Sequence, residues 1–304
     1  MNKLKGFSAL FITAILYGIG GIFIRVLNQE ITVFQQMYIR HFWGFVFAIV
    51  VFLFFVRGKI NFKKISFVPL IAYSILFPSV VFFFTLSIIY TKIADATFGF
   101  YIASIIFSLF IGHFLFNEKI TKLKIAGLLL AIIGLIIFTF PLSKGILNFG
   151  FLCAIICGIL DPITNSLRKH LSPRVDKRIL IAMPLLGGVF MAGIPVVFSH
   201  QSLFPHMSFL AELVALFSGF QFLLFTYLTL VGFQNFDLNL GTIVISLELF
   251  FAPFFATIFL HEYLTVSEII GGVIIGLAIV IPHVQPLRKS KKFRELFSPL
   301  SLWE

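Results

Sequence analysis

Ten stretches of mainly apolar residues, each about 20 residues long, divide this chain of 304 residues. The hydrocarbon core of a bilayer is about 30 Å thick, and a helix of about 20 apolar residues crosses it once. The composition agrees, because 60% of the residues are hydrophobic and only 12% are charged, whereas soluble domains have about 25% charged residues. The sequence therefore predicts an all-α polytopic membrane protein with ten transmembrane helices. The expected spans are residues 7–25, 33–56, 66–89, 95–116, 122–140, 149–168, 178–199, 209–233, 239–260 and 266–284.

The basic residues lie mostly on one side of the predicted membrane. The net charge is +11, and most of the 23 Lys and Arg residues fall in segments that share a side with both termini. Because positively charged loops stay in the cytoplasm, we expect cytoplasmic termini, in the plasma membrane of a bacterium or archaeon. The basic residues mark helix ends and form no patch interleaved with aromatic residues, which argues against a nucleic-acid partner. The tail cluster Arg288–Arg294 could bind anionic lipid, although anchoring of the topology is the simpler interpretation.

The two halves of the chain resemble each other. The segment AILYGIGG at 14–21 matches AIICGILD at 154–161, and the Gly-spaced segment at 124–138 matches the one at 268–281. This similarity predicts two five-helix repeats, residues 1–141 and 145–284, followed by a basic tail at 285–304. Five is an odd number, so the second copy enters the membrane from the opposite side. Inverted repeats of this kind are common in secondary transporters, whose substrate site lies near the midplane between the halves.

The same features resemble a known family. They are the Tyr-Gly pair at Tyr17, a Glu after the fourth and ninth spans, the Gly-spaced fifth and tenth spans, and Pro253 in the ninth. Over about residues 7–284 the chain is similar to the EamA-type branch of the drug/metabolite transporter superfamily. The resemblance implies two inverted five-helix halves, a central cavity, and export or exchange of small polar or amphipathic metabolites. The chain departs from the usual pattern at Cys157, which replaces an aromatic residue, in lacking a Pro in the fourth span, and in its intramembrane acids Asp161 and Glu248.

Glu248 lies in the middle of the apolar stretch 242–262. An ionised acid at this depth costs from about 2.5 to over 10 kcal/mol, so such residues suggest a functional site. In the upstream copy Ser104 takes its place, on a stripe with Tyr101 at helical spacing. We expect the two stripes to face each other and Glu248 to bind substrate or a proton in the cavity. The alternative is an acid that only fixes helix packing.

Asp161 in the sixth span is the second candidate. It lies roughly 18 Å below the outer end of its helix, close to the midplane. Pro162 follows it and removes a backbone donor, and Asn165 lies one turn further on the same face. Kinked helices at this depth expose backbone groups to substrates. The alternative is an Asp that hydrogen-bonds its own kink.

Four further polar residues are candidates. Tyr17 and Gln221 are expected near the midplane, where each could hydrogen-bond a ligand or pack against another helix. Arg40 and His41 are expected toward the outer side. Arg40 could bind a substrate carboxylate, but the favoured interpretation is an ion pair with an acid. The acids in reach are Glu30, Asp95 and Glu212.

The remaining signals set limits on function. Pro78, Pro162 and Pro253 are expected hinge or kink points. No metal site, cofactor motif or catalytic motif was found, so neither an enzyme nor ATP-driven transport is expected. The sequence favours a secondary transporter of a small metabolite, with an amino acid or related amine as leading substrate and proton coupling as an option. The alternatives are hydrophobic-cation or multidrug efflux, a passive channel, a lipid-handling scaffold and an intramembrane enzyme. The expected assembly is a monomer or a homodimer.

Overall fold

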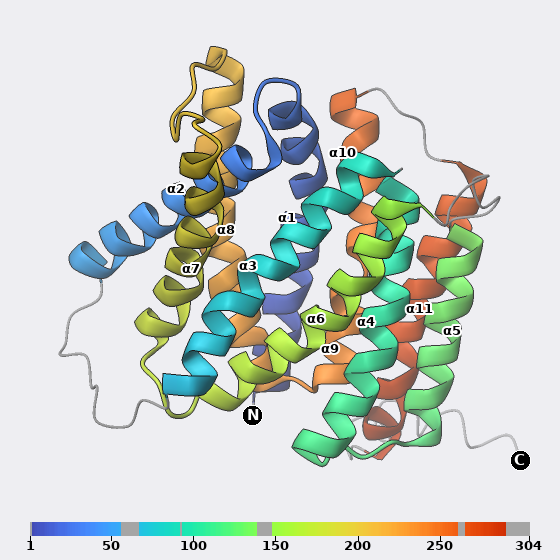
Figure 1. Ribbon diagram of the computed structural model, residues 1–304. Coiled ribbons are helices and arrows are strands. Elements are labelled where there is room, and N and C mark those ends of the chain that lie inside the picture. The colour runs from blue at the N-terminus through green and yellow to red at the C-terminus, as the bar shows by residue number, and fades with distance from the viewer. Residues whose placement is uncertain (1, 56–66, 92, 139–147, 261–264, 290–304) are drawn as a thin grey trace, which may run out of the picture.

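The structure, a computed structural model, describes residues 2–55, 67–91, 93–138, 148–260 and 265–289. These residues form eleven helices and no strand, which confirms the all-helical prediction (Figure 1). The helices are α1 (Lys3–Asn28), α2 (Val33–Phe55), α3 (Phe67–Tyr90), α4 (Ile93–Phe116), α5 (Lys122–Phe138), α6 (Phe149–Leu171), α7 (Lys177–Phe198), α8 (Phe209–Asn235), α9 (Leu238–Ile245), α10 (Glu248–Leu260) and α11 (Val266–Lys289). The tail cluster Arg288–Arg294 falls almost entirely outside the described residues.

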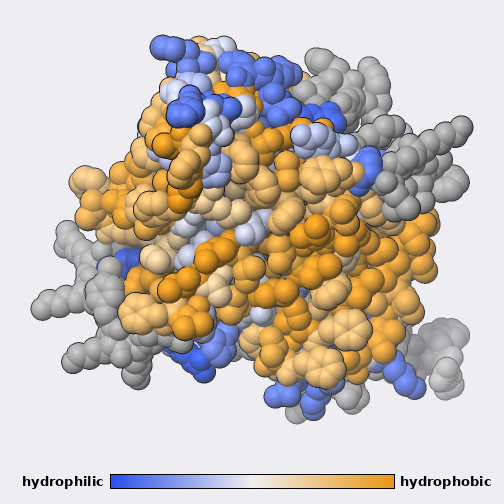
Figure 2. Space-filling view, viewed as in Figure 1, coloured by the Kyte–Doolittle hydropathy of each residue, from blue (hydrophilic) through white to orange (hydrophobic). Residues whose placement is uncertain are grey.

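Eight helical segments of the described chain are long and apolar enough to cross a membrane. They are α1 to α4, α6 to α8, and the stretch Leu238–Phe259, which α9 and α10 share. Figure 2 shows apolar side chains across the middle of the viewed face and hydrophilic ones at its upper and lower ends. Large rings such as Phe114 and Phe198 are exposed, whereas hydroxyl groups such as Ser104 and Ser108 are buried. This distribution is that of a helix bundle solvated by lipid.

The expected ninth span is two helices rather than one. A break at Ser246 and Leu247 separates α9 from α10. Around the break, backbone N–H groups donate to the carbonyl three residues back: Leu247 to Val244 and Leu249 to Ser246. The Ser246 hydroxyl also donates to the Ile243 carbonyl, at 2.7 Å, a local bond that competes with regular helix. The matching region of α4 in the first half is continuous helix.

The helix contacts of α1 in the first half have counterparts in those of α6 in the second half. α1 packs on α8 and α10, and its counterpart α6 packs on α3 and α4. The close approaches depend on equivalent glycines. A Cβ atom on Gly18 would lie 2.8 Å from the Phe251 side chain, and one on Gly158 would lie 2.3 Å from the Phe100 carbonyl oxygen. Because neither glycine has a Cβ atom, α1 can pack closely on α10 and α6 can pack closely on α4.

Candidate functional site: a central charged cavity

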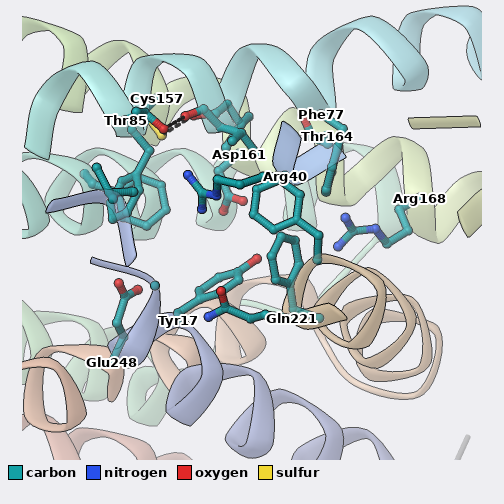
Figure 3. A pocket seen from close by; sticks show the side chains of 18 residues that line it. Tyr17, Arg40, Phe77, Thr85, Cys157, Asp161, Thr164, Arg168, Gln221 and Glu248 are labelled. Carbon is teal, nitrogen blue, oxygen red and sulfur yellow. Dashed lines mark hydrogen bonds between the residues drawn. The ribbon is translucent and has the colours of Figure 1, made fainter. Parts of the chain in front are cut away.

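A cavity lies in the middle of the bundle. Its lining comes from α1, α2, α3, α4, α6, α8 and α10. Most of the lining is apolar, with rings such as Phe77, Phe100 and Phe225, but four charged side chains also line it. The four are Arg40, Asp161, Arg168 and Glu248 (Figure 3). Small-molecule sites likewise combine apolar walls with a few polar groups that fix the orientation of the ligand.

Glu248 is the first residue of α10 and is buried. The break in the ninth span therefore places Glu248 at a helix N-terminus, where the helix dipole favours negative charge. The Tyr101 hydroxyl from α4 donates a hydrogen bond to Glu248 Oε2. The same hydroxyl lies 3.3 Å from the Ile245 carbonyl oxygen, so it bridges the carboxylate and the broken backbone.

Asp161 begins a chain of hydrogen bonds along one face of α6. Its Oδ2 accepts a bond of 3.1 Å from the Ser104 hydroxyl of α4, and its Oδ1 accepts one of 3.0 Å from Asn165 Nδ2. Asn165 Oδ1 then accepts from Arg168 Nη1 at 2.8 Å, and Arg168 Nε donates to the Tyr73 hydroxyl at 2.9 Å. Asp161 is thus held by side chains of α4 and α6.

The sequence does not single out Arg168, because its place at the end of the sixth expected span fits the positive charges that mark helix ends. Its side chain is 2% exposed and lines the cavity. The available signal was its spacing, since Asp161, Asn165 and Arg168 follow each other by four and three residues, on one stripe of the helix.

Arg40 lies in the same cavity as the acids rather than in an outer cluster of its own. The favoured expectation of an ion pair with Glu30, Asp95 or Glu212 is wrong: Nε and Nη1 of Arg40 are buried without a hydrogen-bond partner. Glu30 instead accepts bonds from the backbone N–H and hydroxyl of Ser208, at 2.7 and 2.5 Å. The guanidinium stacks on the ring of Phe222, 4.5 Å from its centroid. His41 does not line the cavity, and its Nδ1 lies 2.8 Å from the Met37 carbonyl oxygen.

The other predicted residues divide into lining and support. Tyr17 and Gln221 line the cavity. Gln221 Nε2 donates to the Leu16 carbonyl, while its Oε1 has no partner. Tyr101, Ser104 and Asn165 were expected to line the cavity, but they lie outside its lining, and each hydrogen-bonds one of the acids.

None of the prolines expected as hinges coincides with the break. Helices α3 and α6 run on through Pro78 and Pro162. Pro253 falls within α10, seven residues beyond Ser246, and its side chain is outside the described part. A hinge role for the three stays a prediction. Among the residues that the structure describes, no cluster of His, Cys, Asp and Glu could hold a metal ion.

Two ion pairs lie at the end of the bundle where α4 is followed by α5. Glu118 Oε1 lies 2.8 Å from Lys169 Nζ and accepts a bond of 2.6 Å from the Leu238 N–H at the start of α9. Lys124 pairs with Asp237 at 2.8 Å. Nearby, hydrogen bonds from the Arg178 side chain lower the pKa of Asp176. We call Glu118, Lys169, Lys124 and Asp237 the end network.

The sequence and the fold were compared with those of known proteins. The sequence profile of the EamA-like transporter family matches residues 4–140 and again residues 143–282. One solved structure, described only as the crystal structure of a protein, has a TM-score of 0.74 and 16% identity over 91% of this chain and 97% of that chain. At this identity the likeness shows the fold alone. No curated protein matches the sequence. The two profile matches span nearly the whole chain, so the resemblance predicted from the sequence is confirmed. The chain is an integral membrane protein that belongs to the EamA-like transporter family.

Proposed function

We propose that the protein is a secondary transporter that moves a small organic molecule bearing an amine through the central cavity by alternating access. The observation that carries this proposal is the pair of carboxylates, Glu248 and Asp161, which line one cavity between the two halves. Neither forms an ion pair with a described residue, and each accepts a hydrogen bond from α4. Acids placed in this way offer a site for an ammonium group, and membership of a transporter family supports passage of that group across the bilayer.

The architecture that we propose has ten spans, with α9 and α10 forming the ninth. Figure 1 supports an inverted repeat, because α1 begins at the lower end of the view whereas α6 ends there. The exchanged contacts of α1 and α6 also support repeats at 1–141 and 145–284. With cytoplasmic termini, the end network lies on the cytoplasmic side. The half-helices α9 and α10 meet at the cavity, as do the discontinuous helices of many transporters.

Proton countertransport is the coupling that we propose. Glu248 has a hydroxyl partner in Tyr101 and no cationic partner among the described residues. A carboxylate in such a site can release its proton when the cavity opens to water and an amine binds. The amine and the proton would then use the same acid in turn, which couples their movements.

Efflux of hydrophobic cations is the second candidate. The aromatic side chains of the cavity wall favour it, because rings stabilise a cation held over their faces. They are Tyr17, Phe77, Phe84, Phe100, Phe222 and Phe225. This candidate uses the same two acids but needs no anion-binding group.

Proteoliposomes loaded with purified protein test the proposal. A panel of amino acids, small amines and hydrophobic cations is screened for uptake driven by a proton gradient. We expect Glu248→Gln to abolish uptake, since the amide carries no charge and exchanges no proton. Glu212→Gln is the matched control, because this exposed acid lies in the first turn of α8, away from the cavity. Full uptake by Glu248→Gln would contradict the proposal.

A further inference from the structure

We propose that Arg40 binds an anionic group of the substrate, a carboxylate in the simplest case, so that the cavity takes a zwitterion rather than a simple amine. This inference rests on the proposed function, because it assigns the second half of the same substrate. The acids Glu248 and Asp161 would hold the ammonium end and Arg40 the carboxylate end.

The Arg40 side chain has hydrogen-bond donors that the described residues do not use. Its side chain is 4% exposed, yet Nε and Nη1 have no hydrogen-bond partner. Buried guanidinium groups are normally paired or fully hydrogen-bonded, because an unpaired buried charge is costly. Its described contact is the stack on the Phe222 ring, and among the described residues Nε and Nη1 have no acceptor. An anionic ligand would supply those acceptors.

Arg168 in the same cavity differs from Arg40 in its hydrogen bonds. Arg168 donates to Asn165 and Tyr73, so the protein itself uses its N–H groups. Both guanidinium groups line the cavity, but Arg40 lacks such acceptors. Burial alone therefore does not explain Arg40, because the fold satisfies an equally buried guanidinium elsewhere in the cavity.

The balance and placement of charge in the cavity also favour a zwitterion. The cavity is lined by two carboxylates and two guanidinium groups. In Figure 3 Arg40 projects into the space between Asp161 on one side and Tyr17 and Gln221 on the other. A simple cation bound to the two acids would leave Nε and Nη1 of Arg40 without acceptors. A zwitterion places a negative group at Arg40, where the planar fork of guanidinium suits a carboxylate.

The test uses matched pairs of ligands that differ by one carboxylate, such as leucine with 3-methylbutylamine and phenylalanine with 2-phenylethylamine. Binding to the purified protein is measured by titration calorimetry for the wild type, Arg40→Gln, Arg40→Lys and Arg168→Gln. We expect Arg40→Gln to weaken binding of the amino acid by about 100-fold and to change amine binding less than about threefold. Arg40→Lys keeps the positive charge but lacks the planar guanidinium group, and we expect it to weaken binding of the amino acid by about tenfold. Arg168→Gln should weaken both ligands alike, because it disturbs the hydrogen bonds of Asp161.

Wild-type protein that binds the amine as tightly as the amino acid would overturn the assignment of Arg40. So would an unchanged amino-acid preference in Arg40→Gln. If Arg40→Gln does not purify as folded protein, an unchanged preference in Arg40→Lys overturns the assignment instead. Glu248→Gln separates this failure from failure of the proposed function. If Glu248→Gln loses amine binding while the Arg40 variants still prefer the amino acid over the amine, only the assignment of Arg40 is overturned. Unchanged amine binding in Glu248→Gln removes the amine site itself.

Discussion

The end network and the central cavity both contain buried charges, but only the end network pairs them with each other. Glu118 is 8% exposed and lies 2.8 Å from Lys169, and its carboxylate also accepts the first N–H groups of α9. In the cavity, Glu248 has a tyrosine hydroxyl as partner and Arg40 has an aromatic ring. Removing one member of a buried pair is costly because the other member stays buried and uncompensated. The comparison therefore separates charges that hold the fold from charges that we propose bind a ligand.

The largest effect on stability is expected in the end network. Glu118→Gln leaves Lys169 without its carboxylate and weakens the hydrogen bonds to the start of α9. We expect destabilisation on the order of 3 kcal/mol, seen as a lower unfolding temperature in detergent, with ligand affinity unchanged within about twofold. A weaker ligand affinity with an unchanged unfolding temperature would show that Glu118 serves ligand binding rather than stability.

The next effect is expected at the second acid of the cavity. Asp161→Asn removes the charge but keeps groups that can bond Ser104 and Asn165. We expect about tenfold weaker binding of an amine-bearing ligand, since a charged partner adds about 1.5 kcal/mol over a neutral one. The unfolding temperature should not fall. Calorimetric titration and thermal unfolding of the same preparation measure both quantities, and a large loss of stability would show that Asp161 is structural.

A smaller effect is expected from the hydroxyl that positions Glu248. Tyr101→Phe removes the hydrogen bond to the carboxylate and leaves the ring in place. A net hydrogen bond is worth about 1 kcal/mol, so we expect about fivefold weaker ligand binding. Tyr227→Phe on α8 is the matched control, because this tyrosine is 44% exposed. Equal affinities for the two variants would show that Tyr101 does not position the acid.

The smallest effect is expected at Glu30, an exposed acid outside the helices. Hydrogen bonds from the hydroxyl and backbone N–H of Ser208 lower its pKa from the ordinary value of 4.5. A lowered pKa means that the folded state favours the carboxylate. The stabilisation is present above about pH 4.5 and is lost as the pH falls through the folded pKa. Glu30→Gln should therefore unfold at a slightly lower temperature than the wild type at pH 7, and the difference should shrink as the pH falls below about 4.5. A difference that does not shrink in acid would contradict this assignment.

The sequence predicted the helices closely because membrane thickness fixes the length of an apolar span. It did not predict the break at Ser246 and Leu247, where neither Pro nor Gly occurs. Pro253, a residue that breaks helices more readily than Ser or Leu, lies within α10. At the break the Ser246 hydroxyl bonds the Ile243 carbonyl, and the Tyr101 hydroxyl of α4 lies near the Ile245 carbonyl. The contact with α4 leaves no local pattern in the chain.

The two acids could be predicted as site residues because an acid stands out in an apolar span. The two arginines were harder to interpret. Arg168 follows a helical pattern, but its position near a helix end also fits the rule for cytoplasmic charge. Arg40 could reach several acids by chain position, and only side-chain packing decides that Glu30 bonds Ser208 instead. Pairing of charges across helices depends on rotamers and helix rotation, which the residue pattern does not encode.

The most direct test of the account is the affinity of Glu248→Gln for an amine-bearing ligand, measured by calorimetric titration beside Glu118→Gln. Both substitutions replace one buried carboxylate by an amide of the same shape. We expect the affinity to fall by about 100-fold in Glu248→Gln and to stay within about twofold of the wild type in Glu118→Gln. An unchanged affinity in Glu248→Gln would contradict the claim that the unpaired charges of the cavity are kept for a ligand.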